Sequence, residues 1–232
     1  MEKQKYAAIV LAAGSGKRMN SKVHKQYLII QDRPVLYYSL KAFEDSAVDE
    51  IVLVVGKGEE EFCRKEIVDK YGISKVKAIV EGGKERYHSV FEGLKQTSDV
   101  DYVLIHDGAR PFVNQDIIRR CMQEVQKYQA CVVGMPVKDT IKIADEEGYA
   151  KQTPDRKNVW MIQTPQTFSY ALIYEAYEEM LKTEDTAITD DAMVLERIKG
   201  KKSKLIEGSY RNIKITTPED LLIANVYLQH PE

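Results

Sequence analysis

The loop best suited to chemistry follows the first apolar run of the chain, where residues 11–19 read LAAGSGKRM. Glycines and two adjacent cations, Lys17 and Arg18, directly after a strand suggest a phosphate ligand. The Walker A pattern would need glycine at position 11 and serine or threonine after Lys17, but the sequence has leucine and arginine there. The dinucleotide pattern would need a third glycine at position 19, which is Met19. Both familiar phosphate motifs are therefore excluded.

This loop still contains the residue types that a triphosphate needs. Small residues allow backbone N–H groups to approach a phosphate chain closely, and here they are Ala12, Ala13 and Gly14. Cations stabilise the charge that builds at phosphorus during a transfer reaction, and those that follow are Lys17, Arg18, Lys22 and Lys25. The alternative is an ordinary solvated basic loop.

Two further loops follow strands in the same way. In residues 81–90, EGGKERYHSV, Gly83 could bring backbone against a base or ribose and Ser89 could hydrogen-bond a ligand, although a tight turn at a helix start is the simpler interpretation. In residues 106–112, HDGARPF, Asp107 could bind the Mg²⁺ that accompanies a nucleoside triphosphate. A turn or capping role is the alternative for Asp107, and His106 is expected to be structural.

Later segments add cations and threonines. Thr140 in VKDTIK and Arg156 in TPDR could hold a second phosphate, or they could lie on an ordinary surface arm. Lys214 stands in a strand-like run where an apolar residue is expected, so an anionic ligand would explain it. The acidic turn at residues 189–191 favours a helix cap.

Several catalytic motifs are missing from the chain. It has no G-x-S-x-G, no H-E-x-x-H, no Cys/His cluster and four histidines in all, which disfavours hydrolysis by a triad or by zinc. A reaction run by cations and one metal carboxylate needs no such base when the nucleophile arrives ionised. A phosphate monoester does so, because its second pKa is about 6.

Short apolar runs alternate with amphipathic stretches, which predicts βαβ units and an α/β fold with a mostly parallel, Rossmann-like sheet and helices on both faces. The expected strands are 7–11, 50–55, 76–81, 102–106, 131–136, 204–207 and 213–215, and the pattern resumes at 161–163. The expected helices are 34–43, 59–71, 87–96, 116–128, 169–181 and 190–198, with a last helix that Thr217 caps. Residues 137–159 interrupt this rhythm as a polar hairpin, either a solvated loop or an arm that packs on another subunit.

The net charge, the cysteine content and the lengths of the apolar stretches limit the classes of protein to which this chain can belong. The 232 residues carry a net charge of −2, so no overall field favours nucleic acid, and we expect a single domain over residues 1–232. The three cysteines show no C-x-x-C spacing, which fits a reducing cytoplasm. No apolar stretch reaches membrane-spanning length, and no signal segment is expected at the N-terminus.

In their order, these motifs resemble the 2-C-methyl-D-erythritol 4-phosphate cytidylyltransferase family over nearly the whole chain. The motifs are LAAGSGKRM with KQY, GGKERYHSV, HDGARPF, PVKDTIK, TPDR, QTPQTF, TDD and NIKITTPEDL. The resemblance implies transfer of a cytidylyl group from CTP to methylerythritol 4-phosphate, with release of pyrophosphate, in non-mevalonate isoprenoid synthesis. It also implies a homodimer formed through the projecting hairpin of residues 137–159, so that Thr140 and Arg156 would act in the neighbouring subunit's site.

The resemblance also implies a role for each site residue. Arg18 and Lys25 would stabilise the transition state at the α-phosphorus, and Asp107 would bind magnesium. The acceptor phosphate would be positioned by Arg156, Lys214, Thr140, Thr164 and Thr189. The nucleotide would be held by Ala12, Ala13, Gly14, Gly83, Ser89 and Arg110.

The chain also departs from the family pattern, with Lys84 where an acidic residue is common, His24 where a proline is frequent and Gly108 in place of a common alanine. Three other functions remain open. They are the related ribitol-5-phosphate cytidylyltransferase, a non-catalytic nucleotide-binding module, and a sugar-nucleotide uridylyl- or guanylyltransferase.

Overall fold

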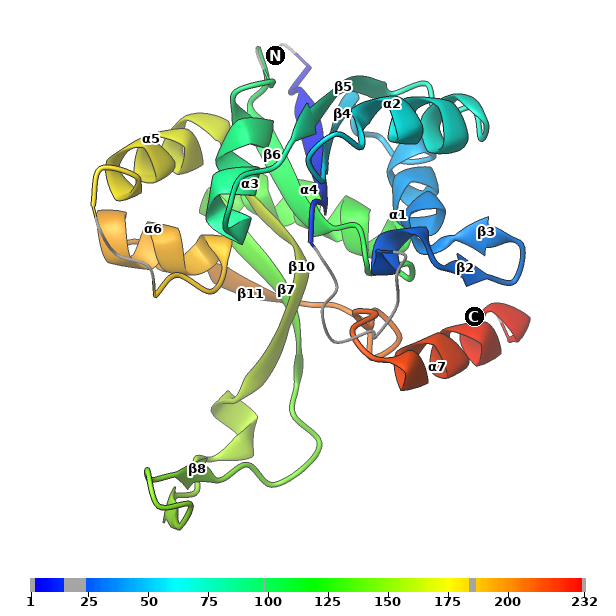
Figure 1. The fold of residues 1–232 in the computed structure, drawn as a ribbon. Helices are drawn as coiled ribbons and strands as arrows, with labels where there is room; N and C mark the ends of the chain where they lie inside the picture. Colours follow the sequence, from blue (N-terminus) through cyan, green and yellow to red (C-terminus); the bar gives the residue numbers. More distant parts are fainter. Residues whose placement is uncertain (1–2, 15–23, 98, 184–186, 231–232) are drawn as a thin grey trace.

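A mixed sheet of seven strands forms the centre of the molecule in the computed structural model, which describes residues 3–14, 24–97, 99–183 and 187–230 (Figure 1). The strand order is β11-β7-β10-β6-β1-β4-β5. The strands are β1 (Tyr6–Ala12), β4 (Glu50–Val55), β5 (Val76–Glu81), β6 (Tyr102–Asp107), β7 (Ala130–Pro136), β10 (Trp160–Ser169) and β11 (Lys204–Glu207).

Most neighbouring strands are parallel. β1 pairs in parallel with β4 and β6, β4 with β5, and β7 with β11, whereas β10 runs antiparallel to both β6 and β7. The mostly parallel sheet is therefore confirmed. The segment expected at 161–163 is longer than expected, because β10 begins directly after the arm, at Trp160, and continues through the sheet to Ser169.

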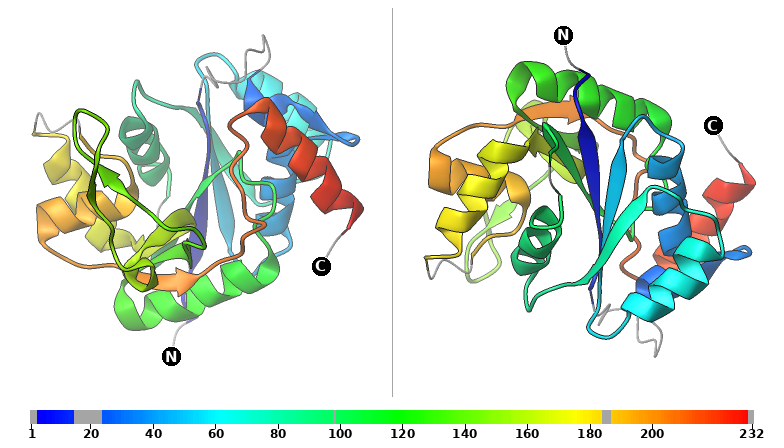
Figure 2. Two further views of the ribbon diagram at one scale, coloured as in Figure 1. Left: turned by 90° about the horizontal axis from the view of Figure 1, so that it is seen from below. Right: turned by 90° about the horizontal axis from the view of Figure 1, so that it is seen from above.

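Helices cover both faces of the sheet (Figure 2). Side chains of α1 (Val35–Glu44), α2 (Glu60–Cys63) and α4 (Gln115–Tyr128) pack into the core on one face. Side chains of α3 (Arg86–Leu94), α5 (Tyr170–Met180) and α6 (Asp191–Lys199) pack into the core on the other. The amphipathic spacing of these segments explains this arrangement, since each helix presents one apolar stripe to the Val- and Ile-rich strands.

Besides the longer β10, two expectations need correction, and the other expected elements are confirmed to within a few residues at each end. Residues 213–215 are not a strand: Ile215 donates its N–H to the carbonyl of Ala109 at 2.8 Å, but the segment has no neighbouring strand with which to form a ladder. The helix expected over 59–71 is divided, because α2 runs into a π-helical turn, η3 (Arg64–Asp69).

A narrow arm extends away from the sheet between β7 and β10 (Figure 1). It contains the antiparallel pair β8 (Ile143–Ala144) and β9 (Ala150–Gln152), followed by the 3-10 turn η4 (Arg156–Asn158). This confirms the hairpin within 137–159, whereas its role in dimerisation and the single-domain interpretation stay predictions.

Two smaller elements lie beside the sheet. The short pair β2 (Ile29–Ile30) and β3 (Arg33–Pro34) packs with the C-terminal helix α7 (Pro218–Gln229) around a separate apolar cluster. Thr217 caps α7 in a capping box with Asp220, as the sequence predicts. Within the described residues, every helix is too short or too polar to traverse a bilayer.

Candidate active site

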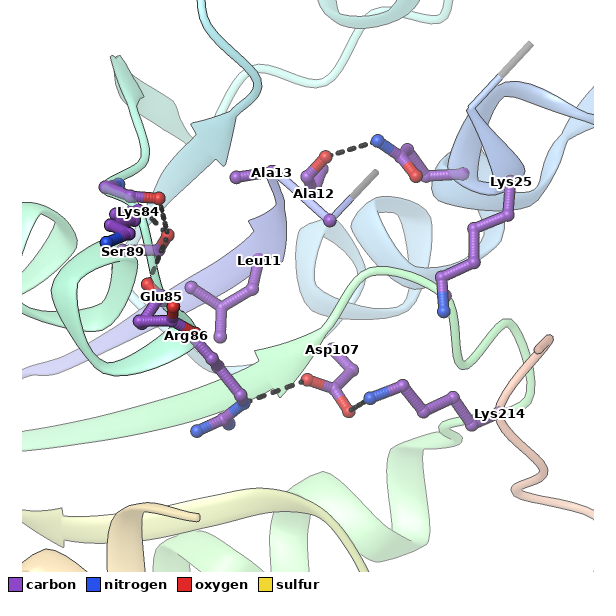
Figure 3. Close-up of a pocket in the computed structure, with 14 residues that line it drawn as sticks. Leu11, Ala12, Ala13, Lys25, Lys84, Glu85, Arg86, Ser89, Asp107 and Lys214 are labelled. Atoms are coloured by element: carbon purple, nitrogen blue, oxygen red, sulfur yellow. Dashed lines mark hydrogen bonds and ion pairs between the residues drawn. The ribbon is translucent and has the colours of Figure 1, made fainter. Parts of the chain in front are cut away.

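A pocket of about 360 Å³ opens where the carboxyl ends of β1, β5 and β6 meet (Figure 3). Ligands of open α/β sheets bind at this edge, because the loops that leave parallel strands converge there. The lining residues are Leu11, Ala12, Ala13, Gly14, Lys25, Gln26, Gly83, Lys84, Glu85, Arg86, Ser89, Asp107, Ala109 and Lys214. Loops far apart in the sequence therefore form one site.

One wall consists of the end of β1 and the one-turn helix η2 (Lys25–Tyr27). The buried Gln26 side chain donates a hydrogen bond to the carbonyl of Ala12, so that η2 is tied directly to the strand end. In Figure 3 the Lys25 side chain extends from η2 toward Asp107 and Lys214. This wall combines small residues with a cation, as the sequence predicts for a phosphate site.

The opposite wall is the turn between β5 and α3. A Cβ atom at Gly82 would lie 2.5 Å from the Cβ of Ala13, and one at Gly83 would lie 2.3 Å from the Cβ of His88. The Ser89 hydroxyl accepts a hydrogen bond from the N–H of Gly83 at 3.1 Å and holds the turn closed. The glycines are therefore needed for close packing. The tight turn at the helix start and the wall of the pocket, given above as alternatives, are formed by the same residues.

Asp107 forms the floor and is surrounded by cations. Its Oδ2 atom lies 2.8 Å from the ammonium of Lys214 and 3.8 Å from Nε of Arg110, and its Oδ1 atom lies 3.5 Å from Nε of Arg86. Burial by itself would raise the pKa of the Asp107 carboxyl, but these three charges outweigh it and hold the pKa far below its usual range. The carboxylate is therefore ionised at any working pH.

Lys214 reaches this carboxylate from a segment without regular secondary structure that is hydrogen-bonded on both sides. The buried Asn212 amide donates to the carbonyl of Thr164 at 2.9 Å, and the N–H of Ile215 donates to the carbonyl of Ala109 at 2.8 Å. In the sequence, Lys214 stands out as a cation in an otherwise apolar run. Its position explains the charge, because the side chain leaves the buried segment and extends toward the pocket.

The sequence motifs do not indicate the role of Arg86. Its guanidinium makes two parallel hydrogen bonds of 2.8 Å each to the carboxylate of Asp191, which is fully buried and also accepts a hydrogen bond of 2.6 Å from Tyr177. Asp190, not Asp191, caps α6, by accepting from the N–H of Met193. The capping expectation thus holds for one aspartate only. The sequence offered one signal for this contact. Two acidic residues stand side by side before α6, and a helix cap needs only one of them.

A buried layer behind the floor fixes the strand end. The Thr164 hydroxyl accepts from the N–H of Asp107 at 3.1 Å and lies 3.0 Å from Nδ1 of His106. Burial lowers the pKa of His106 to about 4, so the ring is neutral and structural, as expected. Arg110 donates to the carbonyl of Asn212 at 2.8 Å and lies beneath Asp107. Thr164 and Arg110 therefore contact the Asp107 loop from behind.

The chain is similar to known proteins over nearly its whole length. The family model described as 2-C-methyl-D-erythritol 4-phosphate cytidylyltransferase matches residues 6–230. Two curated relatives of that name, from Lachnospira eligens and Lachnoclostridium phytofermentans, are 54% identical over 224 residues and 50% identical over 226 residues. These alignments cover 96% of this chain and 98% of the first relative, and 97% of this chain and of the second.

A solved structure from Anaerococcus prevotii, described as 4-diphosphocytidyl-2C-methyl-D-erythritol synthase, superposes with a TM-score of 0.86 at 38% identity. The superposition covers 98% of this chain and 97% of that one. The chain belongs to the 2-C-methyl-D-erythritol 4-phosphate cytidylyltransferase family.

The site residues that the family resemblance implies fall into four groups, of which one is Thr164 and Arg110, behind the Asp107 loop. Those that line the pocket are Ala12, Ala13, Gly14, Lys25, Gly83, Ser89, Asp107 and Lys214. Thr140, Arg156 and Thr189 are exposed and do not line it, with the first two on the arm and Thr189 beside α6. Arg18 lies outside the described residues. Their roles stay predictions.

The departures from the family pattern can also be placed. Lys84 is exposed on the pocket wall and adds a further cation there. Gly108 packs closely, because a Cβ atom at this position would lie 2.8 Å from Cδ1 of Leu36. An alanine at position 108 would therefore need Leu36 to move.

Proposed function

We propose that this chain transfers the cytidylyl group of CTP to 2-C-methyl-D-erythritol 4-phosphate and releases pyrophosphate. The observation that carries the proposal is the set of cations lining one pocket, Lys25, Arg86 and Lys214, around the ionised Asp107. Such a set of cations is suited to binding phosphates. The attacking group is then the phosphate oxygen of the acceptor, which is ionised at neutral pH.

Charge neutralisation and positioning account for most of the proposed catalysis. Lys25 and Arg18 stabilise the negative charge that builds at the α-phosphorus as pyrophosphate leaves. Lys214 and Arg156 position the acceptor phosphate for in-line attack, with Thr140, Thr164 and Thr189 in the same acceptor region. Support comes from the direction of Lys25, whose side chain points toward Lys214 across the pocket (Figure 3).

The turn at Gly82 and Gly83 is the proposed base site. Its backbone approaches the end of β1 as closely as glycine allows, since a Cβ atom at Gly82 would touch Ala13. A flat cytosine ring fits such a backbone-lined wall, and backbone carbonyls can accept from its 4-amino group, which uracil lacks. Ala12, Ala13, Gly14 and Ser89 complete this part of the site, and Arg110 supports it from beneath Asp107.

Asp107 fits a magnesium ion that the triphosphate largely holds. Mg²⁺ in phosphate sites takes one or two carboxylates together with phosphate oxygens and water. Among the described residues no group of three or more His, Cys, Asp or Glu side chains could hold a metal, so Asp107 would be its protein ligand beside the substrate. Bound there, the ion would neutralise phosphate charge. Arg86 and Lys214 contact the two oxygens of the Asp107 carboxylate and fix its position at the floor of the pocket.

The arm over residues 137–159 is the proposed dimer contact. Its hairpin side chains are exposed, including Ile143 at 45% and Tyr149 at 73%, and apolar side chains at this exposure are suited to an interface. Arg156 and Thr140 would then reach the neighbouring subunit's pocket. The three cysteines are buried free thiols, which supports a reducing, cytoplasmic location.

Pyrophosphate release from the purified protein with CTP and Mg²⁺ tests the function directly. We expect release with methylerythritol 4-phosphate and none with ribitol 5-phosphate or when UTP replaces CTP. Release with ribitol 5-phosphate alone would assign the ribitol enzyme. Binding of CTP without release in the presence of either acceptor would favour the non-catalytic module. Lys25→Ala separates these cases further, because an enzyme loses turnover while a binding module loses affinity only.

A further inference from the structure

A cluster of polar side chains outside the pocket surrounds the residues on either side of Lys25. Glu59 follows β4 in the loop that leads into α2, and its carboxylate contacts His24, Tyr27 and the backbone of Gly56. Oε1 of Glu59 lies 2.7 Å from Nδ1 of His24. Oε2 accepts a hydrogen bond of 2.7 Å from the Tyr27 hydroxyl and one of 3.0 Å from the N–H of Gly56.

The Glu59 carboxylate is itself held in one place. A Cβ atom at Gly56 would lie 2.6 Å from Oε2 of Glu59, so the carboxylate rests directly on the glycine backbone. The side chain of Glu59 is only 20% exposed, and Nδ1 of His24 is buried beside it in a close polar contact that lacks hydrogen-bond geometry, so the directed bond to this turn is the one from Tyr27. The Tyr27 hydroxyl also lies 3.1 Å from Sγ of the buried Cys63, at the end of α2. The β4–α2 loop and α2 thus both contact η2 from its outer side.

The inner side of η2 is fixed independently. Gln26 is buried and donates to the carbonyl of Ala12 at the end of β1. Lys25 therefore lies between a tie to β1 through Gln26 and a tie to the β4–α2 loop through His24 and Tyr27. A lysine side chain has a flexible four-carbon stem, so the position of its backbone decides how well its ammonium is aimed.

From this arrangement we propose that Glu59 is a positioning residue for Lys25, acting through His24 and Tyr27 without touching the substrate. The inference deepens the proposed function, because it assigns to a residue outside the pocket the alignment of the cation at the reacting phosphorus. A misplacement of about 1 Å can cost roughly 10²-fold in rate. Loss of the carboxylate releases one side of η2 while the tie through Gln26 keeps the turn in place.

The test combines amide hydrogen exchange with kinetics on Glu59→Ala and Glu59→Gln. In η2 the N–H of Tyr27 donates to the carbonyl of His24 at 2.9 Å and that of Leu28 to the carbonyl of Lys25 at 3.3 Å. We expect these two amides to exchange at least about 10-fold faster in Glu59→Ala, with the amides of α4 unchanged. We also expect kcat to fall about 10- to 100-fold, with a smaller change in KM for CTP. Glu59→Gln, which keeps the shape and one acceptor oxygen, is expected to lie between.

Glu61→Ala is the matched control, because Glu61 is exposed on α2 and loses the same charge only two residues away. It is expected to behave like the unaltered chain in both measurements. A double variant with Lys25→Ala decides whether Glu59 acts through Lys25: the combined kcat should equal that of Lys25→Ala alone.

Three results would overturn the inference: unchanged exchange at Tyr27 and Leu28, faster exchange throughout α4 as well, or losses in kcat that multiply in the double variant. The exchange measurement needs no substrate. If the unaltered chain releases no pyrophosphate, the proposed function fails while the exchange result still decides whether Glu59 fixes η2.

Discussion

Asp107 shows how a single carboxylate can organise several cations. Lys214, Arg86 and Arg110 approach it from three different segments, and each would repel the others without it. The charge of this residue therefore both stabilises the fold and keeps the cations of the pocket in place. A substitution that keeps the shape of this side chain but removes its charge tests the effect of the charge separately from that of packing.

Asp107→Asn is expected to lower the free energy of unfolding by about 3 kcal/mol, because it leaves partly buried cations without their counter-charge. Pyrophosphate release should fall at least about 100-fold, since the cations are no longer held in place. Urea unfolding and steady-state kinetics measure the two effects. Asp116→Asn is the control, because that side chain is 65% exposed and forms an ion pair with the exposed Arg119. Equal stability of the Asp107→Asn protein would contradict this account.

His106 provides a pH-dependent contribution to stability. Its ring is fully buried, with Nδ1 beside Thr164 and Nε2 beside the carbonyl of Arg110. Burial lowers its pKa to about 4 in the folded chain, whereas an unfolded histidine titrates near pH 6.5. Between these values the unfolded chain binds the extra proton, so stability decreases as the pH falls.

We therefore expect the free energy of unfolding to drop by about 3 kcal/mol from His106 as the pH is lowered from about 6.5 to 4. Asp107 does not obscure this interval, because its folded pKa is depressed and its stabilising effect is lost only below its unfolded value near 4. Urea unfolding at a series of pH values is the measurement, with His106→Gln as the comparison. A His106→Gln protein with the same slope over this interval as the unaltered chain would show that another group is responsible.

At the scale of elements, one ion pair joins helices that the sequence separates by a hundred residues. Arg86 begins α3, and Asp191 begins α6. Their bidentate contact, together with the hydrogen bond from Tyr177 of α5, ties three helices on one face of the sheet to the pocket. Burial would lower the pKa of Arg86, but the charges of Asp191 and Asp107 outweigh it and raise that pKa well above its ordinary value. The guanidinium is therefore permanently charged.

Arg86→Met should destabilise the chain by about 3–5 kcal/mol, because it leaves the carboxylate of Asp191 buried and unpaired. Arg86→Lys keeps the charge but loses the two-point contact, and we expect an intermediate effect. Thermal and urea unfolding compare these variants with Arg119→Met, which breaks an exposed pair and should cost less than about 1 kcal/mol. Similar losses for Arg86→Met and Arg119→Met would refute the importance of burial here.

At the scale of the whole molecule, the arm carries two residues of the proposed acceptor site away from the pocket. Thr140 and Arg156 are exposed, and Arg156 donates to the carbonyl of Lys138 within the arm at 3.4 Å. If the arm reaches a second subunit, each site combines Lys25 of one chain with Arg156 of the other. Such shared sites can be tested by mixing variants.

An equimolar mixture of Lys25→Ala and Arg156→Ala subunits, refolded together, is expected to recover about one quarter of the original pyrophosphate release, although each variant alone is nearly inactive. Random pairing makes about half of the dimers mixed, and each mixed dimer holds one intact site of two. The measurement is activity after joint refolding, with size-exclusion chromatography to establish the dimer. Absence of recovery in a confirmed dimer would place Arg156 in its own subunit's site.

The sequence by itself determined the alternation of strands and helices and the residues of the strand-end loops. Both follow from local physics, because buried parallel strands must be apolar and only small residues allow backbone to approach a ligand. This is why Gly83, Asp107 and the β1 loop could be recognised without the fold. The isolated cation Lys214 could be recognised for a related reason, since a charge in an apolar run needs a partner.

The tertiary structure alone decided which of these groups meet. The pairing of Arg86 with Asp191 and the grip of Glu59 on the turn that carries Lys25 join residues far apart along the chain, and no local pattern marks such contacts. Residues 213–215 resemble a strand in sequence but are not one. A strand needs a neighbouring strand to pair with, and whether one is present is decided only when the sheet has formed. Hydrophobic period and turn chemistry act over a few residues, whereas buried ion pairs depend on the three-dimensional arrangement of whole elements.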